Sequence, residues 1–151
     1  MNKTPKVKFA RLVNAMDLPL PEYQTEMAAG MDLRSAIGME IGPGHRELFP
    51  TGLAVELPQG YEGQIRPRSG LAAKHGITVL NSPGTIDADF RGEIVVILIN
   101  HGPHNVKISR GDRIAQFVVA PVARCDIVET TLEKHKATMR GTGGFGSTGK
   151  R

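Results

Sequence analysis

Residues 81–93 read Asn-Ser-Pro-Gly-Thr-Ile-Asp-Ala-Asp-Phe-Arg-Gly-Glu, and they separate a β-type run, Ile77–Leu80, from the apolar run Ile94–Ile99. The Asn-Ser-Pro-Gly cluster is typical of a turn, so the stretch predicts a tight β-hairpin that closes at Gly92. The apolar run is long enough for a strand buried on both faces and too short for a typical helix. We therefore expect a central strand over residues 93–100.

Two acidic residues, Asp87 and Asp89, lie two positions apart in this stretch. On a strand they would share one face, while Ile86, Ala88 and Phe90 would share the other. A hairpin with acids on one side and an aromatic ring on the other is typical of a ligand site. Taken alone, however, the pattern favours the simpler interpretation of solvated turn acids and a phenylalanine packed in the core.

The rest of the chain alternates short apolar segments with turns, and it contains 18 Gly and 10 Pro. Strands separated by short turns predict an all-β sandwich or barrel rather than alternating β and α elements. One short helical turn is expected over Leu71–His75, with Gly76 at its end. Further strands are expected around Val7–Val13, over Leu48–Leu57 with breaks at Pro50, Gly52 and Pro58, over Val106–Ile108 and Ile114–Val122, and last at Ile127, Val128 and Leu132.

Length and cysteine content bound the class of protein. A chain of 151 residues can bury about two-thirds of its unfolded surface in one domain without disulfides. The single cysteine, Cys125, has no partner for a disulfide or a thiolate metal site, so we expect a buried structural thiol and a reducing, cytoplasmic location. No window approaches the ~18 apolar residues of a membrane span, and charged residues interrupt the N-terminal region, so no membrane insertion or export is expected.

The charge balance favours an anionic ligand. Nineteen basic residues against fifteen acidic residues give a net charge of +4 and a pI near 9.5. Aromatic residues make up only 5% of the chain and there is no Trp. That is poor material for stacking the bases of single-stranded nucleic acid, so no nucleic-acid partner is expected.

A glycine-rich tail, Gly141-Thr-Gly-Gly-Phe-Gly-Ser-Thr-Gly149, ends the chain. Apolar content falls from Lys134 onward, so we expect a β-domain over residues 1–133 and a flexible arm over residues 134–151. The tail matches the spacings G-x-G-x-x-G and G-x-x-x-x-G-K, but it does not lie between a strand and a helix, and Arg151 stands where Ser or Thr would bind magnesium. Neither a dinucleotide fold nor a P-loop is expected, although glycine N–H groups can still wrap a polyphosphate.

Three other local patterns are weak in isolation. Pro67-Arg-Ser-Gly70 enters the short helical turn and offers a guanidinium, a hydroxyl and backbone N–H groups to an anion, although a solvated arginine explains it equally well. Arg110-Gly-Asp-Arg113 alone is more typical of a plain turn. His101 and His104 have a metal-like spacing, but they flank Gly-Pro and no third ligand is evident, so zinc is disfavoured.

Five segments together carry a stronger signal. They are Ala29-Gly-Met-Asp-Leu33, Pro67-Arg-Ser-Gly-Leu71, residues 81–92, Arg110-Gly-Asp-Arg-Ile-Ala-Gln116 and Arg140-Gly-Thr-Gly-Gly-Phe-Gly146. In this order and spacing they resemble the five motifs of the trimeric deoxyuridine triphosphatases (dUTPases). The resemblance covers nearly the whole chain. It implies a jelly-roll β-barrel, a homotrimer in which three subunits share each active site, and a C-terminal arm that closes over a neighbour's site.

The resemblance also implies a reaction, the hydrolysis of dUTP to dUMP and pyrophosphate, which supplies dUMP for thymidylate synthesis and keeps uracil out of DNA. Asp87 matches the acid that activates a water for in-line attack at the α-phosphorus. Mg²⁺ is expected to bridge the phosphates, because it prefers oxygen ligands and keeps several waters. Asp32 matches the acid that orients metal-bound waters.

Substrate contacts follow from the same resemblance. Phe90 stands where many members carry a tyrosine under the deoxyribose, so a ring remains to reject a 2′-hydroxyl while the phenol oxygen is missing. Phe145 matches the arm aromatic that stacks on uracil. The expected phosphate contacts are Arg68, Ser69, Gly70, Gln116 and Arg140, with Gly146 and Ser147 in the arm, and the expected uracil contacts are Asn81, Gly84, Thr85 and Ile86.

Two rival functions stay open at this point. The dCTP deaminases resemble this chain in fold and motifs, but their catalytic glutamate aligns with Ile97, which cannot transfer a proton. A non-catalytic jelly-roll binding module with a basic arm is the other alternative. In that case Asp32 and Asp87 would be unhelpful near phosphates unless a metal ion intervened.

Overall fold

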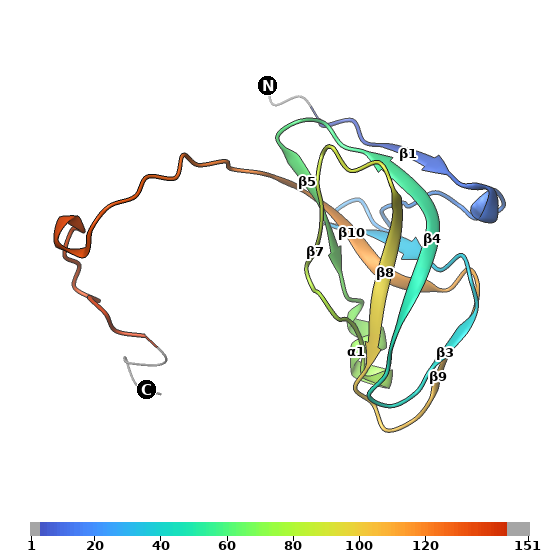
Figure 1. The fold of residues 1–151 in the computed structure, drawn as a ribbon. Coiled ribbons are helices and arrows are strands. Elements are labelled where there is room, and N and C mark those ends of the chain that lie inside the picture. Colours follow the sequence, from blue (N-terminus) through green and yellow to red (C-terminus); the bar gives the residue numbers. More distant parts are fainter. Residues whose placement is uncertain (1–3, 145–151) are drawn as a thin grey trace.

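Two four-stranded antiparallel sheets and one two-stranded ribbon form the body of the computed structural model, which describes residues 4–144 (Figure 1). The strands are β1 (Lys8–Arg11), β2 (Met31–Arg34), β3 (Met39–Ile41), β4 (Arg46–Glu56), β5 (Tyr61–Arg66), β6 (Ile77–Val79), β7 (Gly84–Ile86), β8 (Glu93–Asn100), β9 (Val106–Ile108) and β10 (Arg113–Pro121). The helical elements are α1 (Ser69–His75) and the 3-10 helices η1 (Val13–Ala15) and η2 (Leu132–Lys134). One sheet has the order β1-β4-β8-β6, the other has the order β2-β10-β5-β7, and β3 pairs with β9. The all-β prediction with one short helix is confirmed.

The core lies between the inner faces of the two sheets. Phe49 on β4 and Phe117 on β10 are fully buried, and the ring of Phe117 meets that of Phe9 edge to face at 5.5 Å between centroids. Gly63 on β5 leaves the space that the Phe117 ring fills, because a Cβ at that position would collide with the ring. Burial of such rings is the main term that stabilises the sandwich.

The central position predicted for residues 93–100 is confirmed, since β8 pairs with both β4 and β6. The prediction that both faces are buried is wrong. Ile94 is buried, while Val95 is 38% exposed and Ile97 is only half-buried. Side chains alternate across a strand, and nothing in residues 4–144 covers the outer face of this sheet. An apolar row on β8 therefore faces outward.

The predicted β-hairpin is wrong. β6 pairs with β8 in one sheet, whereas β7 pairs with β5 in the other, so residues 80–83 cross between the sheets. The carboxylates do not lie on a strand either. Residues 87–90 form a turn in which the Phe90 N–H donates to the Asp87 carbonyl at 3.1 Å. Local turn chemistry was read correctly, but the pairing partners lie far away in the sequence.

The break predicted at Pro58 is confirmed, since β4 ends at Glu56, whereas those at Pro50 and Gly52 do not interrupt the strand. Its pairing with β8 shifts register between Pro50 and Ala54. The bulge is supported by side chains: the Thr51 hydroxyl donates to the Ile94 carbonyl at 2.7 Å, and the Gly52 N–H donates to Glu93 Oε1 at 2.7 Å. Gly52 has a φ of 66°, which a β-carbon would disfavour.

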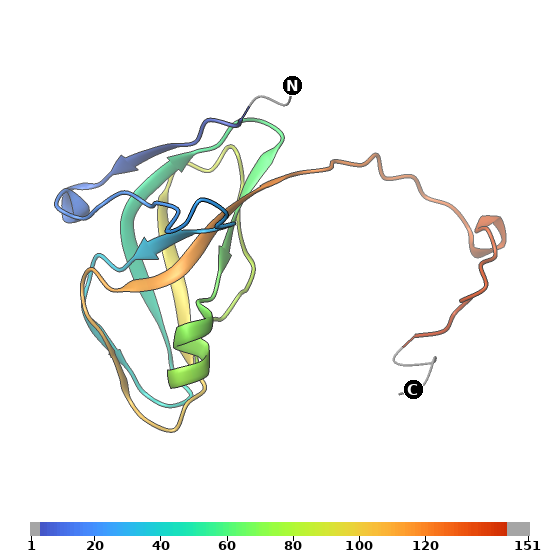
Figure 2. The ribbon, with the colours of Figure 1, turned by 180° about the vertical axis from the view of Figure 1, so that it is seen from behind.

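Residues 122–144 leave the body after β10 and run away from it (Figure 2). The strand predicted around Ile127 and Val128 is wrong for the single chain, since no strand forms there and Ile127 is 95% exposed. Cys125 is exposed, contrary to the expected buried thiol. The domain boundary near residue 134 stays a prediction. No helix within residues 4–144 is both long and apolar enough to cross a membrane.

Candidate active site

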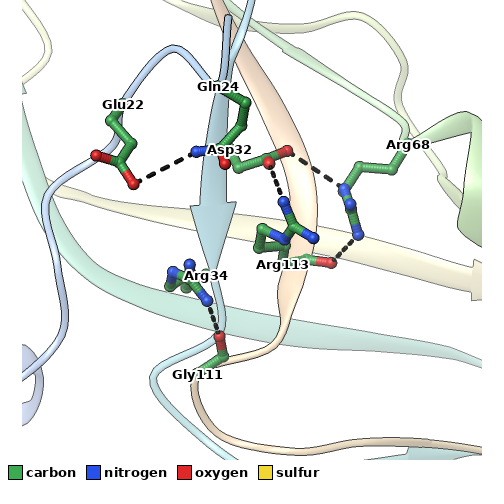
Figure 3. A network of polar contacts seen from close by, with 7 residues as sticks. All are labelled: Glu22, Gln24, Asp32, Arg34, Arg68, Gly111 and Arg113. Atoms are coloured by element: carbon green, nitrogen blue, oxygen red, sulfur yellow. Dashed lines mark hydrogen bonds and ion pairs between the residues drawn. The ribbon is translucent and has the colours of Figure 1, made fainter.

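One candidate site is built on the outer face of the second sheet, where β2 and β10 pair beside the start of α1 (Figure 3). Asp32 on β2 lies directly opposite Gln116 on β10, so the two side chains share one face. Arg68 immediately precedes α1, and its side chain reaches the Asp32 carboxylate. The structure thus brings together three residues that the motifs placed far apart. We call Asp32, Arg68, Gln116 and Arg113 the Asp32 cluster.

A β-bulge adds Arg113 to this cluster. The pairing of β10 with β2 shifts between Arg113 and Ala115, so that Ile114 is an extra residue on the β10 side. Ile114 and Ala115 are both buried, which a regular alternating strand does not allow. The extra residue turns Arg113 to the outer face, where it meets Asp32.

Ion pairs fix the geometry of the cluster. Arg113 Nη1 donates to Asp32 Oδ2 at 3.1 Å, and Arg68 Nε lies 3.3 Å from Asp32 Oδ1. Arg68 Nη1 donates to the Arg113 carbonyl at 2.8 Å. The Asp32 side chain is only 8% exposed, and both ion pairs reach it from the same cluster. Removing one member of a buried pair typically costs about 3–5 kcal/mol, and the partial exposure of both arginines reduces that figure here.

Asp32 also retains an unused acceptor. Its Oδ1 atom is buried and has no hydrogen bond, because the Arg68 N–H is close but not directed at it. A buried carboxylate oxygen without a donor is costly unless a water or an ion satisfies it. Residues 4–144 contain no group of three His, Cys, Asp or Glu side chains that could hold a metal. These residues fit an Mg²⁺ ion that is held mainly by other oxygen ligands and reaches Asp32 through water.

The Arg-Gly-Asp segment before β10 is a turn, as its sequence alone suggested. The Asp112 carboxylate accepts from the Ser109 N–H at 2.8 Å, and Gly111 has a φ of 89°. Arg110 leaves this turn and makes a bidentate contact to Asp17 in the N-terminal loop. The hydrogen bond from Arg110 holds the pKa of Asp17 below its usual value. These contacts anchor the turn from which Arg113 emerges.

Ser69 and Gly70 form the first turn of α1 next to Arg68. Both residues are exposed, and a β-carbon at Gly70 would meet nothing within 4 Å. Gly76 ends the helix in a left-handed conformation with a φ of 69°, as predicted. The structure therefore leaves the hydroxyl of Ser69 and the open side of Gly70 accessible beside the Arg68 guanidinium.

The other predicted residues lie on residues 80–92, which we call the crossing segment. Gly84 is buried and packs against Ile65. A β-carbon added at Gly84 would lie only 3.2 Å from the Cβ atom of Ile65. Thr85 pairs with Gln64 of β5. Asn81, at the start of the segment, lies beside Gly84. The side-chain amide nitrogen of Asn81 would be 3.3 Å from a β-carbon added at Gly84. Gly84 thus leaves no room for a side chain of its own between Ile65 and Asn81.

Phe90 ends the turn that begins at Asp87. Its ring is exposed and lies against Gly92, where a β-carbon would come within 2.7 Å of the ring. Arg91 donates to the carbonyls of Ala88 and Phe90 and so holds the turn. The ring position thus depends on the absence of a side chain at residue 92.

The Asp87 carboxylate is exposed and makes no ion pair or hydrogen bond within residues 4–144. It lines a cavity of about 760 Å³ between β5, the crossing segment and the start of the tail. Two members of the Asp32 cluster, Arg68 and Arg113, line a different cavity of about 440 Å³. Within residues 4–144, the two cavities have no lining residue in common.

The two regions are far apart in one chain. Asp32 and Ile86 are separated by three strand steps, from β2 across β10 and β5 to β7, and by three residues along β5. With about 4.8 Å between strands and about 3.4 Å per residue, the separation is on the order of 17 Å. A single chain therefore does not place the Asp32 cluster and Asp87 around one small group.

The tail contributes one predicted residue to the described part of the chain. Arg140 is exposed, and its Nε atom donates to the Gly143 carbonyl at 2.8 Å. It contacts neither the Asp32 cluster nor the crossing segment. The predicted contacts at Phe145, Gly146 and Ser147 lie outside the described residues.

Comparison with known proteins decides the family. The dUTPase family profile matches residues 16–149. A relative from Methylocella silvestris, a deoxyuridine 5′-triphosphate nucleotidohydrolase, is 53% identical over 153 aligned positions, which cover 99% of this chain and 94% of the relative. The chain belongs to the dUTPase family. The resemblance read from the five motifs is thereby confirmed.

Solved dUTPase structures share the fold. A mutant dUTPase of Staphylococcus bacteriophage 80alpha with dUpNHpp matches with a TM-score of 0.83 at 23% identity, over 95% of this chain and 98% of the other. A mutant dUTPase from phage phi11 of S. aureus, described with a structural Mg(II) ion, matches with a TM-score of 0.75 at 22% identity, over 83% and 96% of the two chains. At this level of identity the likeness establishes the dUTPase fold.

Sequence reasoning missed two contributors to this candidate site. Arg113 lies inside a quoted motif but received no role, and the adjacent buried pair Ile114 and Ala115 is the sequence signal that marks the bulge. Gly92 was read as the end of a hairpin, whereas it provides space for the Phe90 ring. A glycine two residues after an exposed aromatic is a weak signal, so only the three-dimensional contact reveals this role.

Proposed function

We infer that this protein is a dUTP diphosphatase, which hydrolyses dUTP to dUMP and pyrophosphate. The 53% identity over the whole chain and the family match support this assignment. The observation that carries the chemistry is the free carboxylate of Asp87, which is exposed at a cavity and engaged by no cation in residues 4–144. Deamination finds no support, because Ile97 on β8 cannot transfer a proton.

Asp87 is the proposed general base. A carboxylate that holds a water within hydrogen-bond reach can take its proton as the water attacks the α-phosphorus. The turn at residues 87–90 presents this carboxylate without a competing ion pair. Water then forms the new P–O bond while the bond to the pyrophosphate oxygen breaks, so no covalent intermediate with the protein is required.

The Asp32 cluster is the proposed phosphate side of the site. Arg68 supplies a guanidinium for charge-assisted hydrogen bonds, with Gln116, Ser69 and Gly70 as further contacts. Mg²⁺ held by the substrate phosphates would supply charge neutralisation for the leaving pyrophosphate. Asp32 would help to hold that ion through a water that its unused Oδ1 atom accepts from.

The crossing segment is the proposed base and sugar side. Asn81 and the backbone of Gly84, Thr85 and Ile86 read the uracil edge, and a fixed backbone rejects bases whose donors and acceptors are exchanged. The packing of Gly84 against Ile65 supports this rigidity. Phe90 lies under the deoxyribose, where its ring excludes a 2′-hydroxyl.

A homotrimer with shared sites is the proposed assembly. The two regions of the site lie on the order of 17 Å apart in one chain, so the phosphate side of one subunit must meet the base side of another. An outward apolar surface is available for the contact: Leu48 on β4 is 56% exposed beside the outward-facing Ile97 on β8. Residues 134–151 form the proposed arm, in which Arg140 contacts phosphate, Phe145 stacks on uracil, and Gly146 and Ser147 wrap the phosphates.

The test combines a substrate panel with a matched pair of variants. Pyrophosphate release from dUTP, dCTP, dTTP and UTP is measured with magnesium and with a chelator, and the nucleotide products are separated by chromatography. We expect dUMP from dUTP, dependent on magnesium, and little turnover of the other three. Asp87→Asn should lower kcat by about 100-fold or more while dUTP still binds. Asp89→Asn, which lines the same cavity, should stay within about threefold of the wild type.

Two results would contradict the proposal. Ammonia release from dCTP would establish deamination instead, and no turnover of any of the four nucleotides would favour a binding module. Equal losses in Asp87→Asn and Asp89→Asn would remove Asp87 from its proposed role without changing the assigned reaction.

A further inference from the structure

Arg113 contacts both of its charged neighbours in the Asp32 cluster through two different groups. Its side chain donates to Asp32 Oδ2 at 3.1 Å, and its backbone carbonyl accepts from Arg68 Nη1 at 2.8 Å. Asp32 in turn faces Arg68 Nε at 3.3 Å. The three residues form a closed triangle of contacts drawn from β2, β10 and the residue before α1 (Figure 3).

These contacts constrain the guanidinium of Arg68 on two of its three nitrogens. Nε faces the Asp32 carboxylate and Nη1 is bound to the Arg113 carbonyl, while Nη2 makes no hydrogen bond to residues 4–144. The free nitrogen is the one available to a ligand. A guanidinium held in this way loses little freedom when it binds an anion, which favours tight binding.

The triangle itself depends on the charge of Arg113. Asp32 is a nearly buried carboxylate, and a single arginine beside it would be drawn toward it as its sole counter-ion. With Arg113 bound to Oδ2, the charge of Asp32 is balanced from the other side, and Arg68 keeps a nitrogen directed elsewhere. The backbone just before Arg113 is itself fixed by a side chain of β2, since Arg34 donates to the Gly111 carbonyl at 2.8 Å.

We propose that Arg113 is a positioning residue for the phosphate side of the active site, which fixes Asp32 and keeps Arg68 oriented for a triphosphate. This role rests on the proposed dUTP hydrolysis, and Arg113 itself contacts no substrate in it. The geometry that supports it is the closed triangle of contacts and the bulge that turns Arg113 outward.

The test uses side-chain variants with a matched control. Arg113→Gln should raise KM for dUTP about tenfold while kcat changes by less than about threefold, because the loss is in binding of the phosphates. Arg113→Lys, which keeps the charge, should recover most of the affinity. Lys8→Gln removes an exposed ion pair with Glu56, between β1 and β4 in the other sheet, and it should leave KM unchanged.

Coupling to Asp32 separates positioning from general stability. In an Asp32→Asn background, Arg113→Gln should add less than about twofold to KM, because the contact it removes is already lost. The melting temperature is recorded for every variant, and KM is measured well below it. Binding of dUpNHpp by calorimetry should weaken by about tenfold in Arg113→Gln, which provides a readout independent of turnover.

Three results would overturn the role of Arg113. They are an unchanged KM in Arg113→Gln, independent effects of the Arg113 and Asp32 substitutions, and no recovery in a folded Arg113→Lys. A wild-type protein that does not hydrolyse dUTP would instead refute the proposed function.

Discussion

The Asp32 cluster is held by ion pairs among three elements, whereas the Asp87 turn at residues 87–90 is exposed and its carboxylate has no partner in residues 4–144. The first region is assembled within one chain, and its side chains are already oriented. The second presents a reactive group whose surroundings are incomplete. Under the proposed function, this difference separates binding from catalysis: the Asp32 cluster pre-orients cations for the phosphates, and the Asp87 turn supplies the free base.

After substitution of Asp87, deletion of residues 140–151 is expected to have the largest effect on dUTP turnover. The described residues 122–142 are all exposed, so the arm contributes nothing to the core of the single chain. Turnover of dUTP should fall by about tenfold or more, because the groups proposed to enclose the ligand are missing, while the melting temperature changes by less than about 2 °C. Activity assays and thermal unfolding check this prediction.

A single substitution in the arm is expected to have a smaller effect than its deletion. Phe145→Ala should lower turnover in the same direction with the arm still present. A large fall in melting temperature on deletion would show that the arm belongs to the folded body, and unchanged turnover in both variants would remove it from the site.

Phe90→Tyr is expected to have the smallest effect. The ring is exposed, so an added phenol oxygen can reach solvent without burying an unpaired polar group. The preference for dUTP over UTP, measured as a ratio of kcat/KM values, should stay within about threefold. Phe90→Ala is the control, and it should lower the preference by about tenfold because the ring that excludes the 2′-hydroxyl is gone. Loss of preference in Phe90→Tyr would place the discrimination elsewhere.

The sequence predicted the parts of the fold that depend on local chemistry. The helix that ends at Gly76, the central strand at residues 93–100 and the turn before Arg113 are all present. Prediction from the sequence failed where strand pairing between distant segments determines the structure. The hairpin was wrong because β7 pairs with β5, and Ile97 is not buried because nothing in the described chain covers its face.

The site was predictable only as a set of residue types. Asp32, Arg68 and Gln116 could be named from motifs, yet their proximity requires the pairing of β2 with β10. The role of Arg113 depends on a bulge, and a single-residue shift in register is not visible in apolar alternation unless two buried residues stand side by side. The roles assigned to Asp87 and Phe90 stay predictions.

The most direct test of a site shared between subunits is complementation between two inactive variants. Arg68→Gln and Asp87→Asn are each purified and assayed alone. The two variants are also co-expressed in equal amounts with different tags, and dUTP turnover of the mixed protein is measured. If the two regions of one site come from different subunits, about a quarter of the sites in random mixed trimers contain both intact groups. The account predicts recovery to about a quarter of wild-type activity. No recovery in proteins that carry both tags would contradict it and would place Arg68 and Asp87 of one chain in the same site.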